Sequence, residues 1–169
     1  MPNGVNNRSQ SYFIACALQR CECCHKLTPV VGLVLPSGHE TLQIDPDSVS
    51  DALATDIWEA ADGGAILFDI EFLPGIVQNR LRQLSQYYRT TVSEATGSAN
   101  WMNHCSFCGA RQADFDVYCE PEGAFMPISA EVAKNISLNE VREPFAAQAA
   151  GYAYAPEFLE HAQKVAFVG

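Results

Sequence analysis

Two cysteine pairs in this chain have the residue types and spacing of a metal site. Cys21 and Cys24 form one C-x-x-C motif, and Cys105 and Cys108 form a second. This spacing lets two thiolates turn toward one ion, and four such sulfurs suit a tetrahedral Zn²⁺. The sequence therefore predicts one structural zinc ion held by these four cysteines, with two unrelated pairs of buried thiols as the alternative.

The exact ligand register of the first motif stays open. Cys23 lies inside it and His25 follows it, and either could replace a predicted ligand. Gly109 directly follows the second motif, where a tight turn needs a residue that tolerates positive φ. A redox-active pair is disfavoured, because its first cysteine usually begins a helix in a βαβ unit. Residues 100–104 instead have the pattern of a strand.

Composition and charge narrow the class of protein. With 169 residues, the chain is expected to form a single domain, 1–169. No export signal or membrane span is evident at the start of the sequence, and seven cysteines without one favour a reducing, cytoplasmic location. The formal net charge of −10 repels nucleic acid and favours a basic protein partner, and no membrane partner is expected.

Hydrophobic periodicity predicts an α+β fold with zinc-ribbon-like antiparallel β hairpins joined through the zinc site. The hairpins occupy about 12–44 and 100–128, an acidic insertion occupies 45–99, and a C-terminal part occupies 129–169. The insertion is expected to be helix–strand–helix, and the chain is expected to end with a helix. The expected strands are 12–18, 27–35, 41–44, 65–73, 100–104, 114–120 and 124–128. The expected helices are 49–62, 77–88 and 156–165, and a further short helix is expected to begin at Ser129. Residues 138–145 are expected to be extended at the edge of a sheet.

The second motif and its surroundings resemble a known group. Residues 103–110 read N-H-C-x-x-C-G-A and residues 120–125 read E-P-x-G-A-F, while 21–31 contain C-x-x-C followed by T-P-V-V. These stretches resemble small bacterial zinc-knuckle proteins with paired C-x-x-C motifs. The resemblance covers the two hairpins and implies a cytosolic zinc-ribbon-like protein, without implying an activity.

The middle of the chain carries the strongest indication of function. Between Leu27 and Asn79 there are nine acidic residues and no Lys or Arg. Such a stretch makes a coherent negative field that can steer a basic partner. On the helix expected at 49–62, Trp58 faces away from the apolar side and lies among acids. We therefore expect a partner-binding surface made of Asp51, Trp58, Glu59 and Asp62. The alternative is that another element covers this face and that Trp58 belongs to the core.

Features of an enzyme are sparse. Four cysteine ligands leave no open metal position, and the motifs of zinc deaminases and zinc proteases are missing. Cys23 beside His25 is the one conceivable nucleophile and base. The sequence thus favours a non-enzymatic, acidic protein-binding module, for instance an immunity or antitoxin-like protein that neutralises a basic toxin. A zinc-ribbon adaptor in transcription or RNA handling is the alternative, and an enzyme using a cysteine or zinc site is the second.

Overall fold

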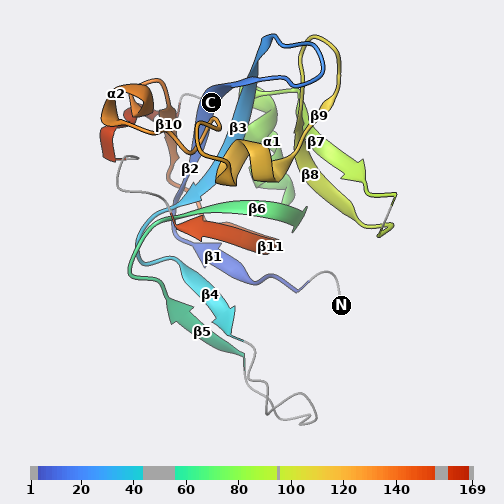
Figure 1. The fold of residues 1–169 in the computed structure, drawn as a ribbon. Helices are drawn as coiled ribbons and strands as arrows, with labels where there is room; N and C mark the ends of the chain where they lie inside the picture. The colour runs from blue at the N-terminus through green and yellow to red at the C-terminus, as the bar shows by residue number, and fades with distance from the viewer. Residues whose placement is uncertain (1–3, 44–55, 95, 155–159, 168–169) are drawn as a thin grey trace.

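A single hydrogen-bonded sheet of twelve strands organises the chain in the computed structural model, which describes residues 4–43, 56–94, 96–154 and 160–167 (Figure 1). The main strand order is β12-β10-β2-β3-β6-β11-β1-β4-β5, and β8 pairs with β6, β7 and β9 beside this path. The strands are β1 (Asn7–Ser9), β2 (Tyr12–Arg20), β3 (Leu27–Leu35), β4 (Glu40–Gln43), β5 (Ile57–Ala60), β6 (Ala65–Phe72), β7 (Tyr88–Val92), β8 (Ala99–His104), β9 (Arg111–Gln112), β10 (Ser137–Val141), β11 (Phe145–Tyr154) and β12 (Gln163–Ala166).

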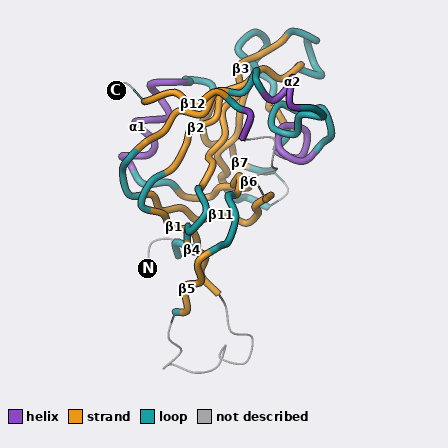
Figure 2. Tube along the Cα trace, turned by 90° about the vertical axis from the view of Figure 1, so that its left-hand side faces the viewer, coloured by secondary structure: helices purple, strands orange, loops and turns teal. Residues whose placement is uncertain are grey.

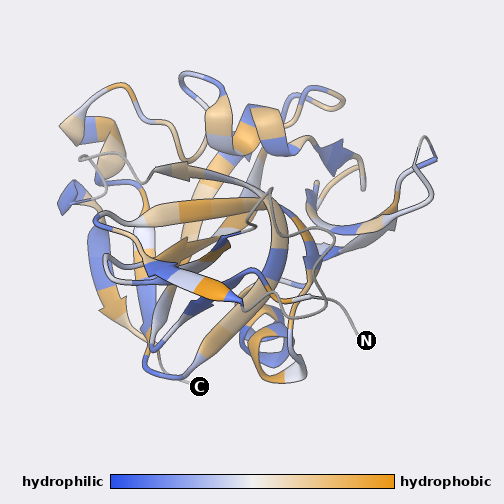
Figure 3. Ribbon diagram, turned by 90° about the horizontal axis from the view of Figure 1, so that it is seen from below, coloured by the Kyte–Doolittle hydropathy of each residue, from blue (hydrophilic) through white to orange (hydrophobic). Residues whose placement is uncertain are grey.

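Two hydrophobic clusters form the core around the central strands. The first is covered by the helix α1 (Gly75–Leu84), which buries Val77 and Leu81 against strand residues. The second gathers around Val117, Tyr118 and Phe125. Because β2, β3 and β6 contribute to both clusters, their side chains are buried on both faces, which explains their nearly continuous apolar sequences. The strands and α1 carry both hydrophobic and hydrophilic stretches (Figure 3).

A three-stranded arm, made of β1, β4 and β5, extends from the body of the molecule (Figures 1 and 2). β1 joins β11 on one side and β4 on the other, and β4 pairs with β5 in antiparallel register. Leu42 lies opposite Trp58 in this register. The arm therefore connects the outermost strand, β5, to the main sheet through two short strands.

The helix expected at 49–62 is wrong where the structure describes it, because Ile57–Ala60 form β5. Apolar residues spaced three or four apart suggested a helix, but pairing with β4 decides the local conformation. Residues 44–55 lie outside the described part, including Asp51 and the expected helix start. The described part of the insertion therefore contains the strands β5 and β6 followed by the helix α1. The second expected helix ends earlier than predicted, because Tyr88 begins β7.

The strand expected at 114–120 is also wrong, since Phe115–Cys119 form a π-helix, η2. Alternating residues suggested one inward face, but Val117 and Tyr118 are both buried while Phe115 is 63% exposed. Residues 124–128 form turns and no strand. Tyr118 and Phe125 nevertheless meet as stacked rings, with centroids 5.5 Å apart. Their stacking holds this irregular segment against β3, where Gly32 leaves room for Tyr118.

The C-terminal part differs from expectation in two further places. Residues 163–165 of the expected final helix belong to β12, which pairs in parallel with β10, and 155–159 lie outside the described residues. β10 has neighbours on both sides and is no edge strand; Pro144 lies in the connection to β11, where a missing N–H is tolerated. The short helix α2 (Ala130–Ala133) is confirmed, with the Ser129 side chain accepting a hydrogen bond from Val132 N.

A buried carboxylate connects η2 to the sheet. Asp114 is 8% exposed, and its Oδ2 accepts a hydrogen bond of 2.8 Å from the backbone N–H of Asp69. Asp69 adopts a left-handed φ of 50°, which turns this N–H toward the carboxylate. Asp114 Oδ1 has no hydrogen-bond partner among the described residues. Burial, with a further contribution from the charge of Asp69, raises the pKa of Asp114 to about 6.

This raised pKa predicts a specific pH dependence for Asp114→Asn. Because the folded protein holds the Asp114 proton more tightly than the unfolded chain, wild type loses stability at this site as pH rises from about 4 to 6. The asparagine variant keeps an acceptor for Asp69 N–H and has no such loss. Its unfolding free energy relative to wild type should therefore rise by up to about 3 kcal/mol across this window. Chemical denaturation at a series of pH values measures the difference, and a pH-independent difference would contradict the assignment.

Candidate metal centre

Two loops bring four sulfurs together at one point. The first knuckle, residues 21–26, joins β2 to β3, and the second, residues 105–110, joins β8 to β9. The Sγ atoms of Cys21 and Cys108 are 3.7 Å apart, and those of Cys24 and Cys105 are 3.6 Å apart. All four sulfurs lie within 4.8 Å of one another, which makes them the one candidate metal cluster of the described residues. The four cysteines that the sequence predicts as ligands are therefore brought together.

The two knuckles have the same backbone hydrogen bonds. In each, the N–H of the first cysteine donates to the carbonyl five residues later, and the residue four places on donates back to the first cysteine's carbonyl. The four bonds are Cys21 N to Lys26 O at 2.9 Å, His25 N to Cys21 O at 2.8 Å, Cys105 N to Ala110 O at 2.8 Å and Gly109 N to Cys105 O at 3.0 Å. This repetition aligns Cys21 with Cys105 and Cys24 with Cys108.

The alignment explains why Cys23 and His25 lie outside the sulfur cluster. His25 occupies the position of Gly109, and both residues have positive φ, 62° and 75°. This position forms the turn of the backbone in both knuckles, and the His25 side chain is not part of the sulfur cluster. Cys23 occupies the position of Phe107, and both are exposed.

Hydrogen-bond donors surround the sulfurs. The N–H of Phe107 approaches Cys105 Sγ at 3.4 Å, and the Gln112 amide approaches Cys21 Sγ at 3.5 Å. The backbone N–H of Cys24 is the main cause that lowers the pKa of Cys21 to about 6. For Cys108, the N–H of Ala110 favours the thiolate, but burial and the neighbouring sulfurs outweigh it and raise the pKa to about 12. Four thiolates this close repel one another unless a cation neutralises them.

Polar contacts between the two hairpins fix their relative position below the sulfurs. The side chain of Asn103 accepts from Val31 N and donates to Val31 O, both at 2.9 Å, so it pairs with β3 as a strand would. Closer to the cluster, Thr28 Oγ1 accepts a hydrogen bond of 2.9 Å from Ser106 N. These contacts connect segments more than 70 residues apart and hold the two knuckles face to face.

His104, next to the second motif, has a structural role of its own. Its ring is buried, with Nε2 2.8 Å from Thr91 Oγ1 and Nδ1 3.0 Å from the carbonyl of Met102. Burial lowers the pKa of His104, helped by the charge of Arg89. Both ring nitrogens thus have partners away from the sulfurs.

Of the residues expected to bind a partner, Trp58 and Glu59 lie in β5 of the arm, in a strand instead of a helix. The ring of Trp58 is half-buried and stacks against the Arg8 guanidinium, 4.0 Å from ring centre to Cζ. Arg8 also pairs with Glu40 on β4. Glu59 and Asp62 are exposed, whereas Asp51 lies outside the described residues. Trp58 was expected to lie among acidic residues, but the structure places the cationic side chain of Arg8 over its ring.

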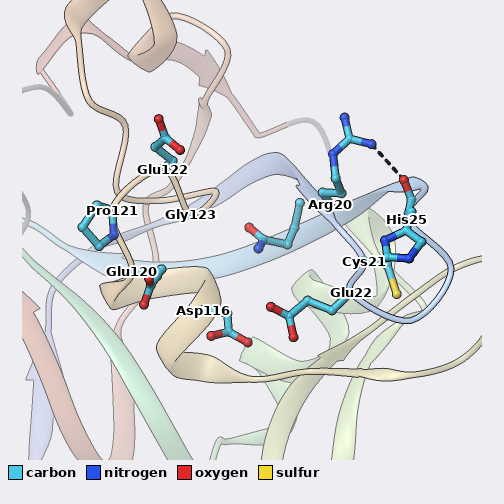
Figure 4. A pocket seen from close by; sticks show the side chains of 10 residues that line it. Arg20, Cys21, Glu22, His25, Asp116, Glu120, Pro121, Glu122 and Gly123 are labelled. Carbon is cyan, nitrogen blue, oxygen red and sulfur yellow. Dashed lines mark hydrogen bonds between the residues drawn. The ribbon is translucent and has the colours of Figure 1, made fainter.

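A second acidic surface, beside the first knuckle, was missed by sequence reasoning. A cleft of about 630 Å³ lies between this knuckle and η2, and its carboxylates come from Glu22, Asp116, Glu120 and Glu122. Glu22 and Asp116 point toward one another across it, while Arg20 donates to the backbone carbonyl of His25 (Figure 4). The acids at 116, 120 and 122 were visible in the sequence. Because that segment was assigned to strands, their gathering on one side was not foreseen.

No family model, curated protein or solved structure gives a significant match to this chain. Among the described residues, no helix has the length and apolar character needed to cross a membrane. The site must therefore be interpreted from its own geometry.

The ligand set predicts opposite results for Cys108→Ser and Cys23→Ser. Removing Cys108 deletes one of four sulfurs and should abolish tight metal binding and much of the cooperative fold. Removing Cys23, which is exposed and outside the cluster, should leave metal content and melting temperature unchanged. Metal analysis by mass spectrometry and thermal melting measure both variants. Full metal occupancy in Cys108→Ser, or loss in Cys23→Ser, would show that the register is wrong.

The left-handed backbone at His25 yields a further prediction. Residues with a Cβ are disfavoured at a φ of 62°, whereas glycine adopts it readily. His25→Gly should therefore keep the metal and raise the unfolding free energy by about 0.5–1 kcal/mol. Gly109→Ala, the equivalent change in the reverse direction, should lower it. Loss of metal from His25→Gly would contradict a purely backbone role.

Proposed function

We propose that this protein is a non-enzymatic binding module, stabilised by one structural zinc ion, whose acidic surface recognises a basic protein. In its most specific form, the proposal is an immunity or antitoxin-like protein that covers the cationic surface of a toxin. Two features support it. Four cysteine side chains can occupy all four coordination positions of a zinc ion, and, among the described residues, the acidic surface has no cations that compensate its charge.

Zinc fits the cluster better than other common ions. A tetrahedral Zn²⁺ with Zn–S bonds of about 2.3 Å requires sulfurs about 3.8 Å apart, close to the observed 3.6 and 3.7 Å. Thiolate ligands also select zinc over magnesium or calcium. Because four cysteines complete the tetrahedron, no position is left for a water or a substrate. The ion would thus join the two hairpins and would not carry out catalysis.

The distribution of acidic and basic residues along the chain is the observation that best supports a role in binding a basic protein. All ten Lys and Arg residues belong to the described part of the chain, and four ion pairs occur there. Of these pairs, only Arg8–Glu40 involves an acid from the stretch between Leu27 and Asn79. The exposed acids Asp56, Glu59 and Asp62 have no ion pair in the described residues. An uncompensated acidic surface attracts a basic protein and repels nucleic acid, which disfavours the adaptor alternative.

A binding experiment tests the proposal. Tagged, metal-loaded protein is used to capture partners from cells of its own organism, and each captured protein is purified and titrated directly. We expect a saturable complex with a basic protein whose affinity falls as salt rises from about 50 to about 200 mM. Single- and double-stranded nucleic acids, titrated in parallel, should not bind. An acidic partner with no salt dependence, or salt-sensitive binding to nucleic acid, would overturn the proposal.

A further inference from the structure

The outer edge of β5 carries backbone groups that no described strand uses. β5 pairs with β4 alone, with Glu59 opposite Thr41, and Ala61 N donates to His39 O at 2.8 Å. Since alternate residues of a strand direct their N–H and C=O to the same side, residues 57, 59 and 61 face β4. The N–H and C=O groups of Trp58 and Ala60 therefore point away from it and make no hydrogen bond to another described residue.

A small hollow lies at the base of the arm, on the face of β5 that carries Glu59. Its volume is about 280 Å³. Thr41 and Gln43 of β4 and the exposed Tyr152 of β11 line it together with the carboxylates of Glu59 and Asp62. Two carboxylates and an aromatic ring are the groups that hold a lysine or arginine side chain.

The charge of this region decides which kind of strand can join the edge. Antiparallel pairing with β5 of a second copy would bring two identical acidic edges together, and like charges on neighbouring strands are destabilising. An extended segment rich in lysine or arginine instead meets the uncompensated carboxylates of Asp56, Glu59 and Asp62. A side chain opposite Glu59 on an added strand lies about 5 Å from it and can reach the hollow.

We propose that β5 binds an extended, basic segment of the partner as an added strand, with one lysine or arginine side chain in the hollow formed by Glu59, Asp62 and Tyr152. This inference rests on the proposed function, and it assigns the contact to the arm. Backbone hydrogen bonds to Trp58 and Ala60 provide affinity, and the hollow selects a cation.

Binding of a synthetic probe tests the inference. The probe is a labelled peptide of alternating lysine and valine, and its control has the same sequence with every backbone nitrogen methylated. The control keeps the charge but donates no backbone hydrogen bond. We expect the methylated peptide to bind at least about tenfold more weakly in fluorescence anisotropy. The unmodified peptide should slow hydrogen exchange at the amides of Trp58 and Ala60.

Variants of the protein test the same backbone and charge contacts from the side of β5. Ala60→Pro removes one outward N–H without removing a hydrogen bond to β4, and it should weaken peptide binding while leaving the melting temperature close to wild type. Glu59→Lys with Asp62→Lys should weaken binding at least about tenfold. Glu94→Lys with Glu160→Lys makes the same change in net charge at exposed positions outside the arm and should have little effect.

The outcomes separate this inference from the proposed function. Equal binding of both peptides would show attraction by charge alone, which overturns strand addition and leaves a basic-protein binder standing. Because this comparison leaves the protein unchanged, it is decisive even if Ala60→Pro fails to fold. Self-association of wild type that Ala60→Pro abolishes would assign the edge to a second copy and overturn the inference. Absence of peptide binding would overturn it as well, while the captured basic protein still tests the wider proposal.

Discussion

Four sulfur atoms contributed by two distant hairpins set the main constraint on this fold. Cys24 and Cys105 are 81 residues apart in the chain, yet their sulfurs lie 3.6 Å apart. Closing a loop of this length costs considerable chain entropy. The proposed zinc ion would offset that cost, because structural zinc sites contribute on the order of 10 kcal/mol. Asn103 and Thr28 align the hairpins at the same junction. Metal binding and the contact that Asn103 of β8 makes with β3 are thus expected to form as one unit.

The rest of the sheet extends outward from this junction, from buried central strands to the more exposed strands of the arm. The core strands β2, β3 and β6 are buried on both faces, whereas β4 and β5 are partly to largely exposed. Arg8 on β1 is the one Lys or Arg in the three strands of the arm, and it contacts Trp58 and Glu40. Its ion pair is exposed and contributes little stability, and the same guanidinium lies over the Trp58 ring. Glu59 on β5 is exposed and has no ion pair among the described residues.

Local chemistry in the sequence predicted which four cysteines come together. The C-x-x-C spacing determined which sulfurs meet, because each knuckle is closed by hydrogen bonds within six residues. The strands on both sides of the first knuckle and the strand that enters the second are confirmed as β2, β3 and β8. The strand expected to leave the second knuckle at 114–120 is wrong, because the short β9 and the π-helix η2 follow that knuckle. The register doubt over His25 arose because a histidine occupies a left-handed position where Gly109 made the same turn obvious in the second knuckle.

Long-range pairing explains the errors. Trp58 has a helical pattern of neighbours in sequence, but its conformation depends on β4, and β4 in turn depends on β1 at the start of the chain. Residues 163–166 join β10 in the same way. In η2, alternation gave the wrong period because packing of Tyr118 on Phe125 favours a compact turn over a strand. No local signal reports such contacts, so the arm and its free edge became visible only in three dimensions.

X-ray absorption at the zinc edge, recorded on protein purified without added metal, tests the central claim most directly. We expect one zinc ion per chain, with four sulfur neighbours at about 2.3 Å and no nitrogen or oxygen in the first coordination shell. A shell that includes nitrogen or oxygen would mean that a histidine, carboxylate or water replaces a cysteine and that the site is open. Absence of any metal would contradict the account, because the two hairpins would then be held together by protein contacts alone.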